Sequence, residues 1–164
     1  DTQTLYFGTE LVLLGSDDGG DSWMQMVRGL PDFFIISALA IDPHDSRTLY
    51  AGALFDGIYK TTDAGEMWRA VGPVDGLVTS LVVDPTDGRV VYAGAGGVFR
   101  SEDGGESWTA IIDGLDDRGV NVVGLDPHDR HNLHAGTKSG VYSISLSGGT
   151  SVRSTPWARI KARF

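Results

Sequence analysis

The sequence contains no cysteine, so no disulfide framework holds the fold together. It has no run of 18 apolar residues, which excludes a membrane-spanning helix. Basic residues are few: 13 Lys and Arg stand against 22 Asp and Glu, a formal charge of −9. An acidic chain suits a phosphate backbone poorly, so nucleic acid is not expected as a partner. With 164 residues, 41% of them hydrophobic, the chain has enough apolar material for one domain with its own core.

Motifs for nucleophilic catalysis and phosphate binding are also missing. There is no cysteine nucleophile, no G-x-S-x-G turn and no G-x-x-x-x-G-K-S/T loop. His128, His131 and His134 fall within seven residues, a spacing at which the first two could chelate a metal. However, His134 occupies the repeat position of Tyr50 and Tyr92, which favours replacement of an aromatic residue in a strand. We therefore expect no metal site and no cofactor.

What the sequence does contain is an internal repeat, which has to be recognised before any fold is assigned. A box with the pattern Ser/Thr-x-Asp-x-Gly-x-x-Trp occurs at residues 16–23, 61–68 and 101–108. A fourth, decayed copy aligns at residues 145–152, where Ser147 replaces the aspartate and Val152 the tryptophan. The aspartate and tryptophan of the three intact boxes are Asp18 and Trp23, Asp63 and Trp68, and Asp103 and Trp108.

Other markers run in step with the boxes. Asp-Pro occurs at 42, 84 and 126, and Ala-Gly at 51, 93 and 135, in each case 42 residues apart. Between the markers lie short apolar or alternating runs, which indicate four strands in every repeat of about 40–45 residues. This pattern predicts an all-β fold, a β-propeller of four-stranded antiparallel blades with about four blades present.

The repeat also sets the expected domain boundaries. We expect a partial blade at 1–28, full blades at 36–71 and 79–112, and a degenerate blade at 120–152, so that the blades together span residues 1–152. Residues 153–164 differ from the rest: they hold four basic residues and no acid, which leaves 9 basic and 22 acidic residues in 1–150. They are therefore interpreted as a basic C-terminal tail.

The box resembles the Asp-box (BNR) repeat of sialidase-like β-propellers, and the resemblance covers residues 2–152. Similar repeats occur in secreted glycoside hydrolases, in sortilin-type receptor ectodomains and in photosystem assembly factors of the Ycf48 group. The resemblance implies an extracytoplasmic location (secreted, periplasmic or lumenal). Such propellers have six, seven or more blades, so about four blades imply a piece of a larger ring, half of a ring completed by a partner, or a rare small ring.

We interpret the box residues as structural. Glycines such as Gly19 and Gly104 can adopt the positive φ of a tight turn. The box aspartates can accept hydrogen bonds from the backbone N–H groups of their own turn. The box tryptophans are expected to be buried between neighbouring sheets. Calcium is the functional alternative, but the boxes lack the ligand spacing and the distal glutamate of an EF-hand loop.

The Asp-Pro turns and the boxes are expected on one face of the propeller, and the ligand site on the opposite face. The loops on that opposite face carry the candidate ligand-binding residues, which are Phe33, Phe34, Phe55, Asp116 and Arg118. Asp32 and Asp56 are the candidate catalytic carboxylates if the protein is a glycosidase.

We therefore predict a non-catalytic binding or assembly module that docks a protein or a glycan on this face. The alternative is a fragment of a secreted glycoside hydrolase, endo-glucanase or sialidase-like, that uses the loop carboxylates. A sialidase-like site would also need an arginine cluster, and no trio of arginines falls on one set of loops. Self-association, or completion by further blades, is expected to cover the open blade faces.

Overall fold

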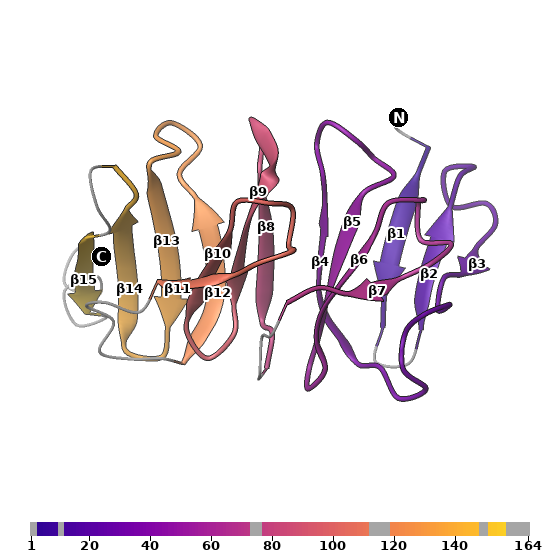
Figure 1. Ribbon diagram of the computed structural model, residues 1–164, viewed down its shortest axis with the longest axis horizontal. Coiled ribbons are helices and arrows are strands. Elements are labelled where there is room, and N and C mark those ends of the chain that lie inside the picture. The colour runs from indigo at the N-terminus through magenta and orange to yellow at the C-terminus, as the bar shows by residue number, and fades with distance from the viewer. Residues whose placement is uncertain (1–2, 10–11, 73–76, 112–118, 148–150, 157–164) are drawn as a thin grey trace.

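The computed structural model describes residues 3–9, 12–72, 77–111, 119–147 and 151–156. These residues form strands and turns, and no helix occurs within the described ranges. The strands fall into four antiparallel sheets that stand side by side in a row (Figure 1). The row is not closed into a ring, so the structure confirms the all-β prediction as a partial β-propeller.

Strand order within each sheet follows the chain. The first sheet has three strands: β1 (Leu5–Gly8), β2 (Leu13–Ser16) and β3 (Met24–Gln25). The second has β4 (Ile36–Ile41), β5 (Leu49–Ala53), β6 (Gly57–Thr61) and β7 (Arg69–Ala70). The third has β8 (Ser80–Asp84), β9 (Asp87–Gly94), β10 (Val98–Ser101) and β11 (Thr109–Ile111). The fourth has β12 (Val120–Leu125), β13 (Asn132–Thr137), β14 (Gly140–Ser145) and β15 (Ser151–Pro156).

The fourth sheet differs from the others at its last hairpin. In the third sheet the first residue of the box, Ser101, pairs with Val91. Leu133 is equivalent to Val91 in the fourth sheet, and it pairs with Ile144. The structural equivalent of the box therefore begins at Ile144, one residue before the start of the copy that aligns by sequence. Without the aspartate and tryptophan to end the pairing, β15 extends to 6 residues, compared with 2 in β7. It runs four residues into the segment that the sequence assigns to the basic tail.

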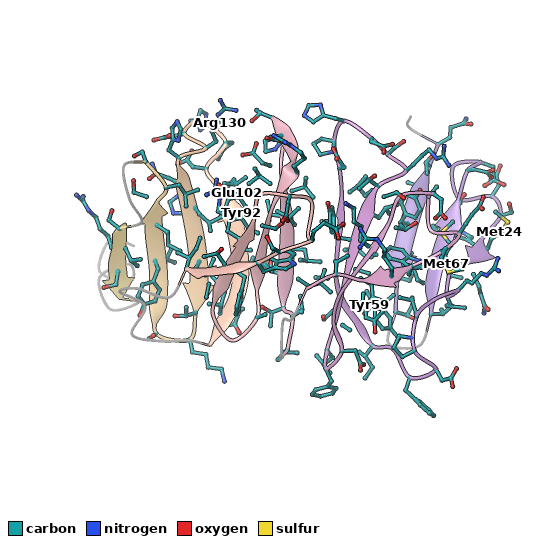
Figure 2. All side chains as sticks on the ribbon, viewed as in Figure 1. Met24, Tyr59, Met67, Tyr92, Glu102 and Arg130 are labelled. Carbon is teal, nitrogen blue, oxygen red and sulfur yellow. The ribbon has the colours of Figure 1, made fainter. Side chains whose placement is uncertain are left out.

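Three apolar clusters fill the spaces between neighbouring sheets. Figure 2 shows these side chains, and labels Tyr59 and Tyr92 from two of the clusters. Small residues on the second strand of each four-stranded sheet, Ala51, Ala93 and Ala135, are 0% exposed and let the sheets approach closely. At Gly52 the approach is closer still, because an added Cβ would lie 2.4 Å from Cγ1 of Val78.

Polar contacts also join neighbouring sheets near the first strands. The hydroxyl of Thr79 donates to the carbonyl oxygen of Val120 at 2.8 Å. The hydroxyl of Ser37 donates to the carbonyl oxygen of Val78 in the same way one sheet earlier. These bonds attach the connections that enter β8 and β12 to the neighbouring sheet, at the ends of the sheets where the first strands begin.

Candidate functional site

Each intact box is closed by a hydrogen-bond network around its aspartate. Asp103 accepts the N–H of Ser107 at 2.9 Å and its hydroxyl at 2.6 Å. Ser101 donates to Asp103 at 2.8 Å and accepts the N–H of Gly105 at 2.8 Å. Hydrogen bonds from Ser107 and Ser101 lower the pKa of Asp103 from 3.8 to about 2. The carboxylate is therefore engaged by its own turn.

The other two boxes repeat this network. Asp18 accepts the N–H and hydroxyl of Ser22, and Asp63 accepts the N–H of Met67. The pKa of each carboxylate is lowered, chiefly by the side-chain hydrogen bond from Ser22 to Asp18 and from Thr61 to Asp63. All three carboxylates therefore accept hydrogen bonds from within their own turns.

The boxes also connect neighbouring sheets. The carbonyl oxygen of Gly104, in the third sheet, accepts the hydroxyl of Tyr50 at 3.1 Å and Nζ of Lys60 at 2.8 Å, both from the second sheet. Nζ of Lys60 lies 5.4 Å from the centroid of the Tyr50 ring. Burial raises the pKa of Tyr50 to about 12 and lowers that of Lys60. No sequence motif marks this pair, although a tyrosine recurs 42 residues later at Tyr92 and a cation 40 residues later at Arg100.

The box tryptophans differ in burial. Trp68 is 2% exposed, and its Nε1 donates to the carbonyl oxygen of Met26 in the preceding sheet at 3.1 Å. Trp108 is half-buried and packs against Gly72. The expectation of burial is wrong for Trp23, which is 43% exposed and touches Phe7 edge-on at 6.5 Å. In the described part of the chain no sheet lies on that side of β1, β2 and β3.

The loop face is the face of the array opposite the box turns. It is formed by the connections between the second and third strands of the four-stranded sheets and by the connections between successive sheets. Two of these loops carry strongly exposed aromatic rings: Phe33 is 90% exposed and Phe55 is 76% exposed. The N–H of Leu54 donates to the carbonyl oxygen of Ile35 at 2.9 Å, which ties the two loops together. Asp32 and Asp56 are exposed beside the two rings.

A hollow of about 230 Å³ lies beside Asp32. It is lined by Val12, Leu13, Gln25, Val27, Leu30, Pro31, Asp32 and Phe34. Phe34 is only 8% exposed, and its ring packs edge-on against Tyr59 with 5.1 Å between the ring centroids. It therefore lines the hollow and does not offer an exposed ring for stacking on a ligand. Gln25 ends β3, and Val27 lies two residues beyond it. Both fall outside the loops in which the sequence predicts site residues.

The remaining candidate residues, Asp116 and Arg118, are outside the described residues. Among the residues that the structure describes, no group of three or more His, Cys, Asp or Glu is placed to hold a metal ion. The described ranges also contain no helix long and apolar enough to cross a membrane.

The fold and the boxes together define an open array of β-propeller blades. No family model and no curated protein sequence matches the chain. Solved propeller structures do resemble it. The chain is similar to an ancestral GH74 enzyme, with 22% identity and a TM-score of 0.77 over 94% of this chain and 23% of that one. It also resembles the GH74 enzyme of Niastella koreensis, with 21% identity and a TM-score of 0.69 over 93% of this chain and 28% of that one.

A second kind of protein with the same fold is YCF48 in a structure with a bound D1 peptide. Identity is 15% and the TM-score is 0.69, over 98% of this chain and 54% of that one. YCF48 from Cyanidioschyzon merolae gives 16% identity and a TM-score of 0.66, over 94% of this chain and 52% of that one. The 164 residues thus span about a quarter to a half of these propellers, and at these identities the likeness shows the fold alone.

Proposed function

We propose that this array is a non-catalytic binding module that docks a protein or a glycan on its loop face. The observation that carries the proposal is the pair Phe33 and Phe55, 90% and 76% exposed on two hydrogen-bonded loops. Exposed rings of this size are costly in water unless a ligand covers them. Because the loops are joined at Leu54 and Ile35, the two rings belong to one surface.

The chemistry around the rings suits a ligand with both apolar and hydrogen-bonding parts. Aromatic faces stack on sugar rings or on the side chains of a partner. Asp32 and Asp56 would accept hydrogen bonds from hydroxyl or amine groups on such a ligand, and the hollow beside Asp32 adds the amide of Gln25. A GH74 enzyme and YCF48 with a bound D1 peptide both share this fold, which is compatible with either a glycan or a peptide ligand. An extracytoplasmic location remains part of the proposal.

The test is a binding titration of the chain against β-glucan oligosaccharides, sialosides and a peptide panel, followed by calorimetry on any ligand found. Phe33→Ala and Phe55→Ala should each weaken binding at least about fivefold, since a stacked ring contributes roughly 1–3 kcal/mol. Phe7→Ala is the matched control, because Phe7 is also an exposed phenylalanine, at 56%, but lies on the first sheet away from these loops. Equal losses in all three variants would contradict the proposal.

Hydrolysis is the alternative function, and it rests on the GH74 fold neighbours. A glycosidase needs two carboxylates roughly 5–10 Å apart across the scissile bond. Asp32 and Asp56 stand on the two joined loops and are the candidates. Turnover of a β-glucan or sialoside that is lost in Asp32→Asn or Asp56→Asn would establish the hydrolase, whereas binding without turnover would support the module.

A further inference from the structure

Two neighbouring loops of the loop face each carry an aromatic ring beside a carboxylate. We call these four exposed side chains the acid–aromatic patch: Asp32 and Phe33 in one loop, Phe55 and Asp56 in the other. Asp32 lines the hollow described above. Burial and, less strongly, the negative charge of Asp56 raise the pKa of Tyr59, whose ring packs against Phe34 in the wall of that hollow. Both carboxylates therefore act on the same part of the loop face.

The two carboxylates of the patch differ from the aspartates in the turns at the other end of the sheets. The box aspartates accept hydrogen bonds from their own turns, and the aspartates of the Asp-Pro turns accept backbone N–H groups in the same way. Within the described residues neither Asp32 nor Asp56 accepts a hydrogen bond or forms an ion pair. Their oxygens are therefore available to a ligand.

The side chains around these carboxylates accept hydrogen bonds but scarcely donate them. Among the described residues that line the hollow, Gln25 is the one side chain with a donor, and the others are apolar apart from Asp32. The loop at residues 54–57 contains no donor side chain. Sugar hydroxyls both donate and accept, so a sugar needs donors from its site as well as acceptors. Lysine and arginine side chains only donate, and a set of acceptors fits them better.

The rings and the overall charge also suit a cation. The face of a phenylalanine ring attracts ammonium and guanidinium groups, and the rings of Phe33 and Phe55 are the most exposed in the described structure. Arg28 stands before Asp32 in the same loop but forms no ion pair within the described residues. The chain carries a formal charge of −9, so its field attracts a basic ligand and repels an acidic one.

The first loop is held in place from both ends. The N–H of Trp68 donates to the carbonyl oxygen of Arg28 at 2.9 Å. Gly29, at φ +88°, comes so close to Trp68 that an added Cβ would lie 2.1 Å from its carbonyl oxygen. The bond between Leu54 and Ile35 fixes the other end. Because the loop is fixed before a ligand arrives, little binding free energy is lost in ordering it.

We propose that the acid–aromatic patch binds a basic peptide segment of a partner protein through lysine or arginine side chains. The charged group of such a side chain lies between a ring and the neighbouring carboxylate, and the aliphatic stem of one of them enters the hollow beside Asp32. The inference rests on the proposed function, because it names the class of partner for the same loop face. A neutral glycan is the other possible outcome of the test.

The test uses the 164-residue chain and a labelled peptide of six Arg-Gly repeats. The same peptide with citrulline in place of arginine keeps the shape of the side chain and removes its charge. We expect the arginine peptide to bind at least about tenfold more tightly than the citrulline peptide, since hydrogen bonds between charged groups are the stronger ones. Added salt should weaken the binding of the arginine peptide and leave that of the citrulline peptide nearly unchanged.

Three variants with the same change in net charge locate the peptide. Asp32→Asn and Asp56→Asn should each weaken binding of the arginine peptide at least about threefold, as expected for loss of an exposed ion pair. Asp17→Asn is the matched control and should leave binding unchanged. Asp17 is also exposed and makes no hydrogen bond or ion pair within the described residues, but it lies in the first box, on the face opposite the patch.

The inference is overturned if the arginine peptide does not bind, if the citrulline peptide binds equally well, or if Asp17→Asn weakens binding as much as the other two variants. Binding of a β-glucan oligosaccharide that is weakened by Phe33→Ala, with no binding of the arginine peptide, would overturn the inference and leave the proposed function in place. If Phe33→Ala and Phe55→Ala change the binding of neither probe, the proposed function fails as well.

Discussion

The backbone N–H of Ala64 donates to the carbonyl oxygen of Arg47 at 2.9 Å, with Ala64 at φ +64°. The equivalent bonds in the other two boxes are made by glycines: Gly19 donates to Gln3 at 2.8 Å and Gly104 to Arg89 at 2.7 Å. Each bond joins a box to the segment just before the strand that pairs with the box hairpin. Of the three intact boxes, only the second has a residue with a Cβ, Ala64, at this positive-φ position.

Ala64→Gly should therefore stabilise the protein. A left-handed backbone costs an alanine roughly 1–2 kcal/mol, and glycine gives back part of that gain through the entropy of the unfolded chain. We expect a net increase of about 0.5–1 kcal/mol in the free energy of unfolding, measured by denaturant titration. Ala70→Gly, in the exposed strand β7, is the control and should lower stability. A loss in both variants would show that Ala64 is not strained.

Trp68→Phe should be much more damaging than Trp23→Phe. Trp68 is 2% exposed and donates to Met26 in the neighbouring sheet, so the change leaves a cavity and an unpaired carbonyl and should cost about 2–3 kcal/mol. Trp23 is 43% exposed, and its loss should cost less than about 1 kcal/mol. Similar costs in thermal unfolding would mean that Trp23 is covered in solution.

The buried Gly104 carbonyl gives a prediction about non-additivity. Tyr50→Phe or Lys60→Met alone leaves one donor, so each should cost about 1 kcal/mol. The double variant leaves the acceptor unsatisfied, and its cost should exceed the sum by about 1 kcal/mol. The 5.4 Å cation–π contact is lost only in Lys60→Met, because phenylalanine keeps the ring at position 50, so its loss adds to that single cost and not to the excess. Simple additivity in urea unfolding would exclude the shared acceptor.

The box aspartates should make the protein sensitive to acid. The pKa of Asp103 falls from 3.8 to about 2 on folding, so its contribution to stability is complete above pH 4 and is lost as pH falls through about 2. Asp103→Asn should be less stable than the parent at neutral pH, and the difference should shrink across that window. The check is chemical unfolding of both proteins from pH 7 to pH 2; a constant difference would count against it.

The repeat made the fold predictable from sequence. Asp-Pro, Ala-Gly and the boxes recur at nearly fixed intervals; Asp-Pro and the boxes mark turns whose chemistry is local, and Ala-Gly marks the second strand of a sheet. Contacts between neighbouring sheets were harder to predict from the sequence. Exposure of Trp23 depends on what lies beside the first sheet, and burial of Phe34 depends on Tyr59 from the next sheet. Both depend on packing between repeats, which the residues of a single repeat do not specify.

The loop face illustrates the same limit. The exposed rings Phe33 and Phe55 lie in loops that the repeat pattern located, because strands of known order fix where the connections emerge. The hollow beside them includes Gln25 and Val27, which no motif marks. A cavity between sheets depends on the sizes of side chains that meet from different repeats, so only coordinates reveal it.

The contact of Gly104 with Tyr50 and Lys60 gives the junction between the second and third sheets a direction: a glycine turn stands on one side and a tyrosine with a lysine on the other. The junction between the first and second sheets is built differently, because Gly15 stands at the position of Lys60 and Ala64 at that of Gly104. The third sheet carries both halves of the contact, Gly104 and the pair Tyr92 and Arg100, so a unit of about 42 residues copied from it meets a suitable neighbour when it is placed beside itself. His134 and Ser143 make the last sheet a poor source for such copying, so growth of the array by duplication is expected to draw on the third sheet.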